Sequence, residues 1–307
     1  MTLLAALVVI TGQVVPMLKG DDPLDVKFVT TDVANFWKAY DASKSQDPET
    51  CFRDLYFTPG TPGLKSFVFL RLRDPKSFSG NVDKMRSFYD SIPHDASAID
   101  AQVPRMRSAL LAFKNLYPEA RFPTVYFVVG QASTGGTTAA PGLLIGAEMY
   151  ARTAKADFSS MGTWQKRVIA TADVLPAIVA HELVHYNQRG LSQDTVLAKS
   201  ITEGAADFIG ELSSGFQING AIHTYGHAHE AELWKEFKAE KDSRDLKRWM
   251  YNGDQPDRPA DLGYFVGYRI VQSYYQKAPN KREAIKTILE TKDFPKLLEE
   301  SGYKGGG

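Results

Sequence analysis

The sequence predicts an α+β protein that is mostly α-helical, with a small sheet in an N-terminal lobe and a helical C-terminal lobe. Two observations lead to this prediction. Over most of the chain, apolar residues recur at spacings of three and four, which is the period of an amphipathic helix. Residues 122–129 instead form a run of β-branched and aromatic side chains of strand length. We therefore expect one small sheet surrounded by helices.

The composition is that of an ordinary globular protein. The 307 residues contain 36 basic and 36 acidic side chains, so the charge balance gives no indication of binding to nucleic acid or to an anionic membrane. Hydrophobic residues make up 43% of the chain and aromatic residues 11%. Cys51 is the single cysteine, which excludes an internal disulfide, and we interpret it as a buried thiol without a chemical role.

The N-terminal region carries an apolar run of eight residues, 3–10. This length suits the hydrophobic region of a signal peptide and is too short for a bilayer span, so we expect no integral membrane segment. However, no basic residue precedes the run, and a buried N-terminal strand is the alternative. No cysteine follows closely to support a lipid anchor. We assign residues 1–22 to a signal peptide and 23–307 to one domain with lobes at 23–190 and 191–307. The protein is then secreted or periplasmic, and otherwise cytoplasmic.

Three helices are expected in the first half of the chain. The first spans residues 32–43, with Asp32 as its cap and one apolar face, made by Val33, Phe36, Trp37 and Tyr40. Residues 81–91 and 97–117 form the other two, and the latter has the clearest helical spacing. Residues 64–72 are apolar but fit either a helix or a strand.

Two strands are expected next, at residues 122–129 and 143–150, joined by a flexible loop at 130–138. We predict that they form a hairpin whose outer strand is one wall of a cleft. Extended peptides commonly bind such an edge through main-chain hydrogen bonds. A purely structural hairpin is the alternative.

The strongest chemical signal is the HExxH motif from His181 to His185. It lies in a helical apolar context, and Pro176 suits the first turn of that helix. Residues i and i+4 share one face of a helix, so His181 and His185 can bind one metal ion. Glu182 points in a neighbouring direction, where it can reach a metal-bound water.

A second helix supplies the remaining ligand. Asp194 is its expected cap, and residues 213–215 (Ser-Ser-Gly) end it. Glu203 and Asp207 share one face of this helix. Two His and one Glu form a known catalytic zinc set with one open position, and we expect Asp207 to fix the orientation of one ligating histidine.

Two further features join the metal-binding helices. A short turn at Arg189-Gly190 connects them, and Gly204, beside the ligand, is expected to let them approach closely. The alternative interpretation of the whole pattern is two surface histidines and a solvated pair of carboxylates.

The motif and its spacing resemble the gluzincin, or thermolysin-like, branch of zinc metallopeptidases. The resemblance implies a zincin-like fold, one Zn²⁺ per chain bound by His181, His185 and Glu203, and Glu182 as general base. It also implies that Asp207 supports a ligating histidine and that the substrate is a peptide or protein.

A narrower resemblance extends to segments outside the motif. Residues 32–40 (DVANFWKAY), the motif region and residues 263–268 (GYFVGY) are similar to a bacterial family of predicted Zn-dependent proteases related to a gliding-motility lipoprotein group. The gluzincin pattern of the substrate-binding strand is not clearly met here. Cleavage specificity therefore cannot be carried over.

The resemblance to gluzincins implies that the lobe beyond Glu203 supplies a donor for the oxyanion of the transition state. We predict helices at residues 230–249, 262–276, 281–289 and 294–298, with a polar turn at 252–259. Tyr268 is the favoured donor, followed by Tyr264 and His227, since a phenol stays neutral and protonated. His223 and Tyr225 are further candidates. An aromatic stripe packed in the core is the alternative for both tyrosines.

Two other functions fit the same residues. The first is a binding protein that keeps the zincin fold without turnover, although Glu182 is present. The second is a structural zinc site closed by a fourth ligand, His223 or His227. A separate second metal at His223, His227 and His229 is a weaker interpretation than surface and capping roles.

Overall fold

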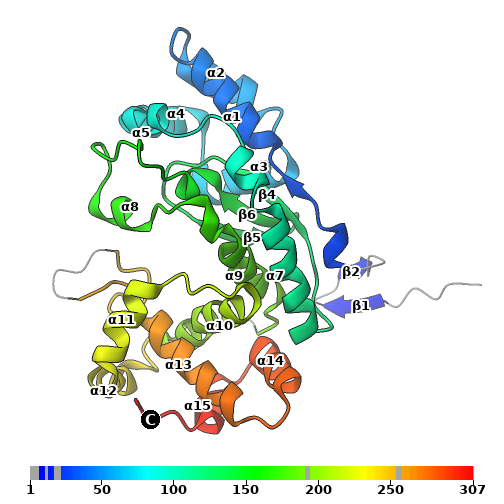
Figure 1. The fold of residues 1–307 in the computed structure, drawn as a ribbon, viewed down its shortest axis with the longest axis vertical. Coiled ribbons are helices and arrows are strands. Elements are labelled where there is room, and N and C mark those ends of the chain that lie inside the picture. Colours follow the sequence, from blue (N-terminus) through cyan, green and yellow to red (C-terminus); the bar gives the residue numbers. More distant parts are fainter. Residues whose placement is uncertain (1–6, 11–12, 17–21, 191–193, 254–257, 307) are drawn as a thin grey trace, which may run out of the picture.

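The computed structural model describes residues 7–10, 13–16, 22–190, 194–253 and 258–306 (Figure 1). The chain is α+β and mostly helical, with one four-stranded sheet, as the sequence predicts. The strands are β1 (Leu7–Ile10), β2 (Gln13–Pro16), β3 (Phe28–Val29), β4 (Thr124–Val128), β5 (Gly136–Ala139) and β6 (Gly142–Gly146).

The helices divide between the two halves of the chain. In the first half they are α1 (Thr31–Ala42), α2 (Pro48–Phe52), α3 (Pro62–Phe67), α4 (Pro75–Lys84), α5 (Arg86–Ser91), α6 (Ser97–Asp100), α7 (Val103–Leu116) and α8 (Thr163–Val168). Shorter turns there are η1 (Pro23–Asp25), the π-helices η2 (Arg53–Phe57) and η3 (Val68–Leu72), η4 (Ala147–Tyr150) and η5 (Ala172–Val174). In the second half they are α9 (Leu175–Asn187), α10 (Val196–Ser214), α11 (Gly220–Ala228), α12 (Glu230–Glu240), α13 (Leu262–Lys277), α14 (Lys281–Glu290) and α15 (Phe294–Ser301).

The sheet has the strand order β3-β4-β6-β5, and its topology corrects the predicted hairpin. The two predicted strands correspond to β4 and β6, which pair in parallel. The hairpin partner of β6 is β5, which lies inside the segment expected to be a loop. A two-residue turn makes this possible: Gly142 adopts φ +149°, and a Cβ there would lie 2.0 Å from the carbonyl oxygen of Thr124. An edge strand therefore exists, but it is β5.

Several helix boundaries also differ from the predictions. The 32–43 helix is present as α1, but Asp32 is not its cap, because this carboxylate is fully buried and accepts hydrogen bonds from the backbone and hydroxyl of Thr61. The 97–117 helix is interrupted by a turn and becomes α6 and α7. The 230–249 helix ends early, at Glu240 in α12. The ambiguous 64–72 segment is helical throughout α3 and η3.

The second metal-binding helix, α10, begins one residue later than predicted and ends where predicted. Thr195 is the cap and accepts a hydrogen bond from the backbone of Ala198, while Asp194 pairs with Lys199 at 3.3 Å. At the other end Gly215 is left-handed, with φ +75°, and closes the helix. The predicted turn at Arg189-Gly190 lies in the connection between α9 and α10, which also includes residues 191–193, outside the described residues.

Helices α9 and α10 lie between the two lobes (Figure 1). The sheet and the earlier helices lie on one side of them, and α11 to α15 lie on the other. One hydrophobic core connects the two sides. Gly204 has a different partner from the predicted one: a Cβ there would lie 2.1 Å from the backbone nitrogen of Tyr268, so it brings α10 against α13. Gly210 is the residue of α10 that faces the backbone of α9, at His181.

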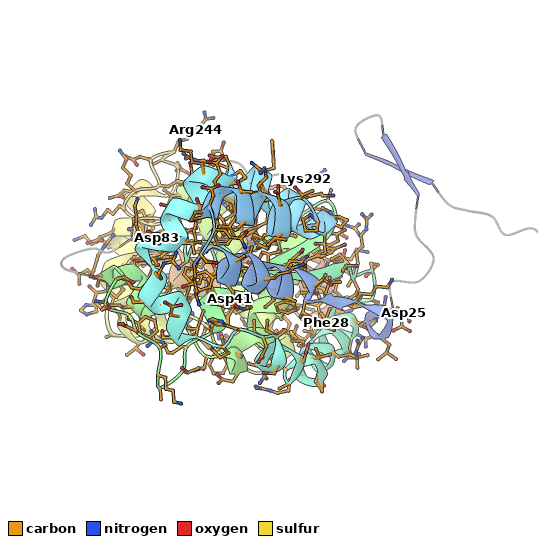
Figure 2. All side chains as sticks on the ribbon, turned by 90° about the horizontal axis from the view of Figure 1, so that it is seen from above. Asp25, Phe28, Asp41, Asp83, Arg244 and Lys292 are labelled. Carbon is orange, nitrogen blue, oxygen red and sulfur yellow. The ribbon has the colours of Figure 1, made fainter. Side chains whose placement is uncertain are left out.

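The N-terminal region forms a separate two-stranded antiparallel pair, β1 with β2 (Figure 2). Residues 1–6, 11–12 and 17–21 of the predicted signal peptide lie outside the described residues. Within the described chain, no helix has both the length and the apolar character needed to cross a bilayer. Cys51 is buried with a free thiol, as expected.

Candidate metal centre

The HExxH motif lies in the middle of α9, a helix that is almost entirely buried. Pro176 occupies the first turn, where its missing N–H has no helical partner to lose. The apolar residues around the motif pack into the core, which orients the motif toward α10. His181 and His185 are only 11% and 18% exposed at their side chains.

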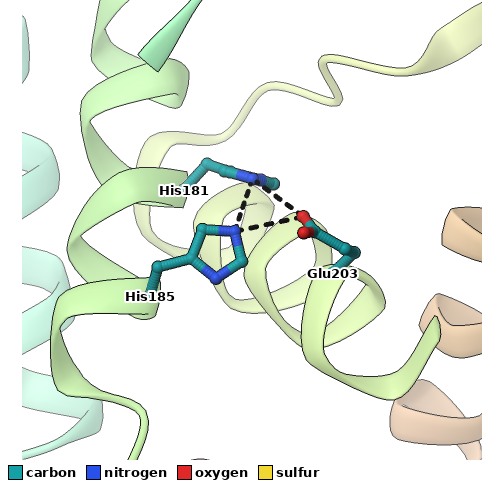
Figure 3. A group of neighbouring side chains, drawn as sticks. All are labelled: His181, His185 and Glu203. Carbon is teal, nitrogen blue, oxygen red and sulfur yellow. Dashed lines mark hydrogen bonds and ion pairs between the residues drawn. The ribbon is translucent and has the colours of Figure 1, made fainter. Parts of the chain in front are cut away.

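Three side chains from these two helices converge (Figure 3). Nε2 of His181 lies 3.0 Å from Nε2 of His185. Oε2 of Glu203, on α10, lies 3.1 Å from the second of these nitrogens and 3.6 Å from the first. The one-turn spacing on α9 and the approach of α10 at Gly210 therefore bring the predicted residues together.

The outer nitrogen of each imidazole ring has its own acceptor. Nδ1 of His181 lies 2.9 Å from Oδ1 of Asp207, which is buried one turn after Glu203. The other oxygen of Asp207 accepts a hydrogen bond from Asn219 at 2.7 Å. Nδ1 of His185 lies 2.9 Å from Oε1 of Gln188, the residue after α9. With its proton on Nδ1, next to these acceptors, each ring would offer the Nε2 lone pair to a metal ion.

These assignments provide a test of whether the site suits a cation. Two imidazole lone pairs and one carboxylate oxygen face each other at 3.0–3.6 Å, and lone pairs at this distance repel unless a positive charge lies among them. Two ligands at ~2.0 Å from one tetrahedral ion are about 3.3 Å apart. The donor set, its spacing and its supporting acceptors all fit a zinc ion.

The histidines and carboxylates of the site shift one another's pKa values. Burial alone would raise the pKa of Glu203, but the two imidazoles hold it well below its usual value. Burial likewise opposes the positive charge on His181, whereas Asp207 and Glu203 raise its pKa well above the usual value. The carboxylates therefore favour positive charge at this position, as a metal-binding site requires.

Glu182 lies beside the converging groups, with its carboxylate against the edge strand. A Cβ added at Gly136 of β5 would lie 2.4 Å from Oε1 of Glu182, so only glycine fits there. Burial raises the pKa of Glu182, and the two histidines oppose this. Among the described residues, no hydrogen bond occupies its carboxylate. Glu182 is free to accept a proton next to the metal-binding groups.

Two of the three predicted oxyanion donors lie away from these groups. The hydroxyl of Tyr268 donates to Glu211 at 2.9 Å, and its ring packs against His223. His227 is exposed, 3.9 Å from Glu230. Neither placement supports the predicted role. Tyr264, the second choice, is near the site: burial raises its pKa, and the charges of Glu203 and Asp207 raise it further.

Tyr251 is a site residue that sequence reasoning missed. Its hydroxyl donates to Oε1 of Glu203 at 2.8 Å, while most of the side chain, 59%, is exposed. Its backbone is left-handed, with φ +54°, a conformation that costs a non-glycine residue about 1 kcal/mol or more. The next residue, Asn252, exchanges two hydrogen bonds with Asp261, the residue before α13. Such strain occurs most often where a side chain has a function.

The segment that leads from β4 to the edge strand is held by side chains. The hydroxyl of Tyr56 donates to the carbonyl of Val129 at 2.6 Å and accepts from its N–H at 2.9 Å. Tyr89 donates to the carbonyl of Gly130 at 2.8 Å. The buried carboxylate of Glu148 accepts from the N–H groups of Gly130 and Ala132 at 2.8 and 3.0 Å. These hydrogen bonds hold the segment that precedes β5, and so help to position β5 next to Glu182.

Comparison with protein families gives one match. Residues 73–305 match the model of the family described as gliding motility protein GldB, which covers more than two thirds of the chain and includes the converging side chains. Neither the curated proteins nor the solved structures contain a match. The match confirms the predicted relation to a gliding-motility group. The chain belongs to the gliding motility protein GldB family.

Proposed function

We propose that this protein is a zinc-dependent metallopeptidase with a zincin-like catalytic domain. The observation that carries the proposal is the convergence of His181, His185 and Glu203, with an acceptor oxygen 2.9 Å from each Nδ1 and Glu182 free beside them. A zinc ion bound there would act as a Lewis acid that activates water and polarises a peptide carbonyl.

Residues of the chain would orient the ligands, transfer the proton, stabilise the oxyanion and bind the substrate. Asp207 and Gln188 keep the Nε2 lone pairs of the two histidines directed at the metal position. Glu182 accepts the proton of the attacking water and passes it to the leaving amine. Tyr251 and Tyr264 are the phenols closest in placement to an oxyanion donor. The edge strand β5 offers main-chain groups to an extended substrate.

The alternative functions lose support from the positions of the histidines. A closed structural zinc site would need His223 or His227 as a fourth ligand. His223 packs against Phe265 and Tyr268, and His227 is largely exposed beside Glu230. In the described part of the chain, neither one joins the converging group. A non-catalytic binding protein would not need the buried, unbonded carboxylate of Glu182.

The family also bears on location. Its model is labelled as a lipoprotein family and described as a gliding motility protein. Together with the apolar run at residues 3–10, this supports a protein that acts outside the cytoplasm, in the periplasm or after secretion.

Cleavage of a diverse peptide library tests the proposal. The protein is stripped with a chelator, measured for zinc, and assayed before and after one equivalent of zinc is restored. We expect one zinc per chain and cleavage only in the reloaded protein, with zinc absent from His185→Ala. Reloaded protein that binds zinc but cleaves no peptide would favour the binding-protein alternative.

A further inference from the structure

A cationic side chain, Arg71, contacts the edge strand β5. This residue belongs to the π-helix η3, and its Nη2 donates to Oγ1 of Thr137 in β5 at 3.3 Å. The backbone carbonyl of Arg71 accepts a hydrogen bond from Gln131 at 3.4 Å, and Gln131 in turn accepts one from Asn81 at 2.8 Å. The guanidinium is therefore bonded to the strand, and the backbone of Arg71 is bonded to the segment that precedes the strand.

Arg71 and the proposed general base lie on opposite faces of β5. Gly136 is directed at Glu182, and the next residue, Thr137, must point to the other face because side chains alternate along a strand. The register agrees: Thr137 pairs with Leu144, and Leu144 with Tyr126, whose ring lies against Gly63 of α3. Successive strand residues are ~3.3 Å apart. Measured along the strand, the position that contacts Arg71 is therefore only one residue from the position that contacts Glu182.

The charge of Arg71 is not neutralised by the protein. In the described part of the chain it has no ion pair with a carboxylate, and its side chain is exposed. Two exposed apolar side chains precede it, Phe69 at 87% and Leu70 at 44% exposed. A fixed, exposed cation therefore lies at the outer face of β5.

We propose that Arg71 binds a carboxylate of the substrate and makes the enzyme selective for acidic peptides. This rests on the proposed peptidase function. A peptide that extends along β5 directs alternate side chains to the two faces of the sheet. Those on one face meet the metal centre, and those on the other meet Arg71. A guanidinium binds a carboxylate through two parallel hydrogen bonds. The carboxylate belongs either to an Asp or Glu side chain or to the C-terminus of the peptide.

Binding measurements on the zinc-loaded Glu182→Gln variant separate recognition from turnover. Fluorescent ten-residue alanine-rich peptides carry one Asp or the matched Asn at each position in turn, each with a free or an amidated C-terminus. We expect one position at which Asp binds about tenfold more tightly than Asn, or a comparable loss on amidation. Adding Arg71→Ala removes the difference, and Arg71→Glu reverses it, so that Asn binds more tightly than Asp. Lys65→Ala, an exposed cation on α3, leaves it unchanged.

The two peptide series identify the source of the carboxylate. Equal binding of every Asp and Asn pair and of both C-terminal forms overturns the inference. A preference that persists in Arg71→Ala, or no measurable binding of any peptide, overturns it too. Failure of the proposed function has a different signature: the preference exists and depends on Arg71, but zinc-loaded wild-type protein cleaves none of the peptides. Cleavage by the wild type without the preference overturns only the role of Arg71.

Discussion

The carboxylate of Asp207 lies 2.9 Å from Nδ1 of His181, on the side of the ring opposite the nitrogen that faces Glu203. Both acidic residues lie on α10, one turn apart, so a single helix carries a proposed ligand and the group that orients another ligand. The hydrogen bond from Asn219 fixes the second oxygen of Asp207. This relationship leads to the first prediction.

Asp207→Asn should weaken zinc affinity by roughly 10- to 100-fold, because an amide is a weaker acceptor for the ring N–H. Competition with a chromophoric chelator measures the change. Glu211→Gln is the matched control, since Glu211 lies one turn further along α10 and bonds Tyr268 rather than a histidine. Equal zinc affinity in the wild type and Asp207→Asn would show that Asp207 does not support the metal site.

Tyr251→Phe should retain zinc and fold while kcat for peptide cleavage falls by roughly 10²–10³-fold, because its hydroxyl lies next to Glu203 at the proposed metal site, where an oxyanion would develop. Tyr268→Phe is the control, and its kcat should fall less than tenfold, since this hydroxyl is engaged by Glu211. The opposite order of the two effects would restore the donor expected from the sequence. Loss in Tyr264→Phe alone would assign the role to Tyr264.

Glu148 should make stability fall as pH rises. Burial raises its pKa from the usual 4.5 to about 7, although the N–H groups of Gly130 and Ala132 favour the ionised form. Between pH 4.5 and about 7, the Glu148 carboxyl keeps its proton in the folded protein but loses it in the unfolded chain. The contribution is therefore fully present below pH 4.5 and is lost as pH rises through 7. The loss amounts to about 3 kcal/mol in the free energy of unfolding.

Denaturant titrations between about pH 4 and 8 test this for the wild type and Glu148→Gln, which cannot titrate at this position. The difference between the two free energies of unfolding should change with pH in the stated direction. Parallel curves would mean that Glu148 keeps an ordinary pKa in the folded protein.

Gly204→Ala should destabilise the fold by about 3 kcal/mol, since the new methyl group would lie 2.1 Å from the backbone of Tyr268 and force α10 away from α13. Gly80→Ala is the control, because Gly80 lies within α4 and a Cβ there meets nothing within 4 Å. That change should stabilise the protein by about 0.5–1 kcal/mol. Thermal unfolding compares the two variants. A Gly204→Ala variant as stable as the wild type would show that α10 and α13 can move apart at little cost in free energy.

The chemical core of the site was accessible from the sequence because helical geometry dictates it. His181 and His185 share a face by their spacing, and Glu203 and Asp207 do so on the next helix. The approach of one helix to another is a tertiary property and was assigned to the wrong glycine. Gly204 meets α13, while Gly210 meets α9.

Residues contributed by other elements were not accessible in this way. Tyr251 reaches Glu203 from a strained loop, and Arg71 reaches Thr137 from a π-helix, so both contacts depend on packing between distant segments. Strand β5 was missed because residues 130–138 are rich in glycine, serine and threonine, as loops are. The dipeptide Pro141-Gly142 was the signal for the turn into β6.

In the proposed mechanism, Glu182 accepts a proton from water at a zinc site formed by His181, His185 and Glu203. The most direct measurement is kcat for peptide cleavage and zinc content, side by side, in the wild type and Glu182→Gln. Glutamine fits the same position but cannot accept the proton. We expect one zinc per chain in both proteins and hydrolysis only in the wild type. Glu182→Gln that cleaves peptides at a rate near that of the wild type would contradict it.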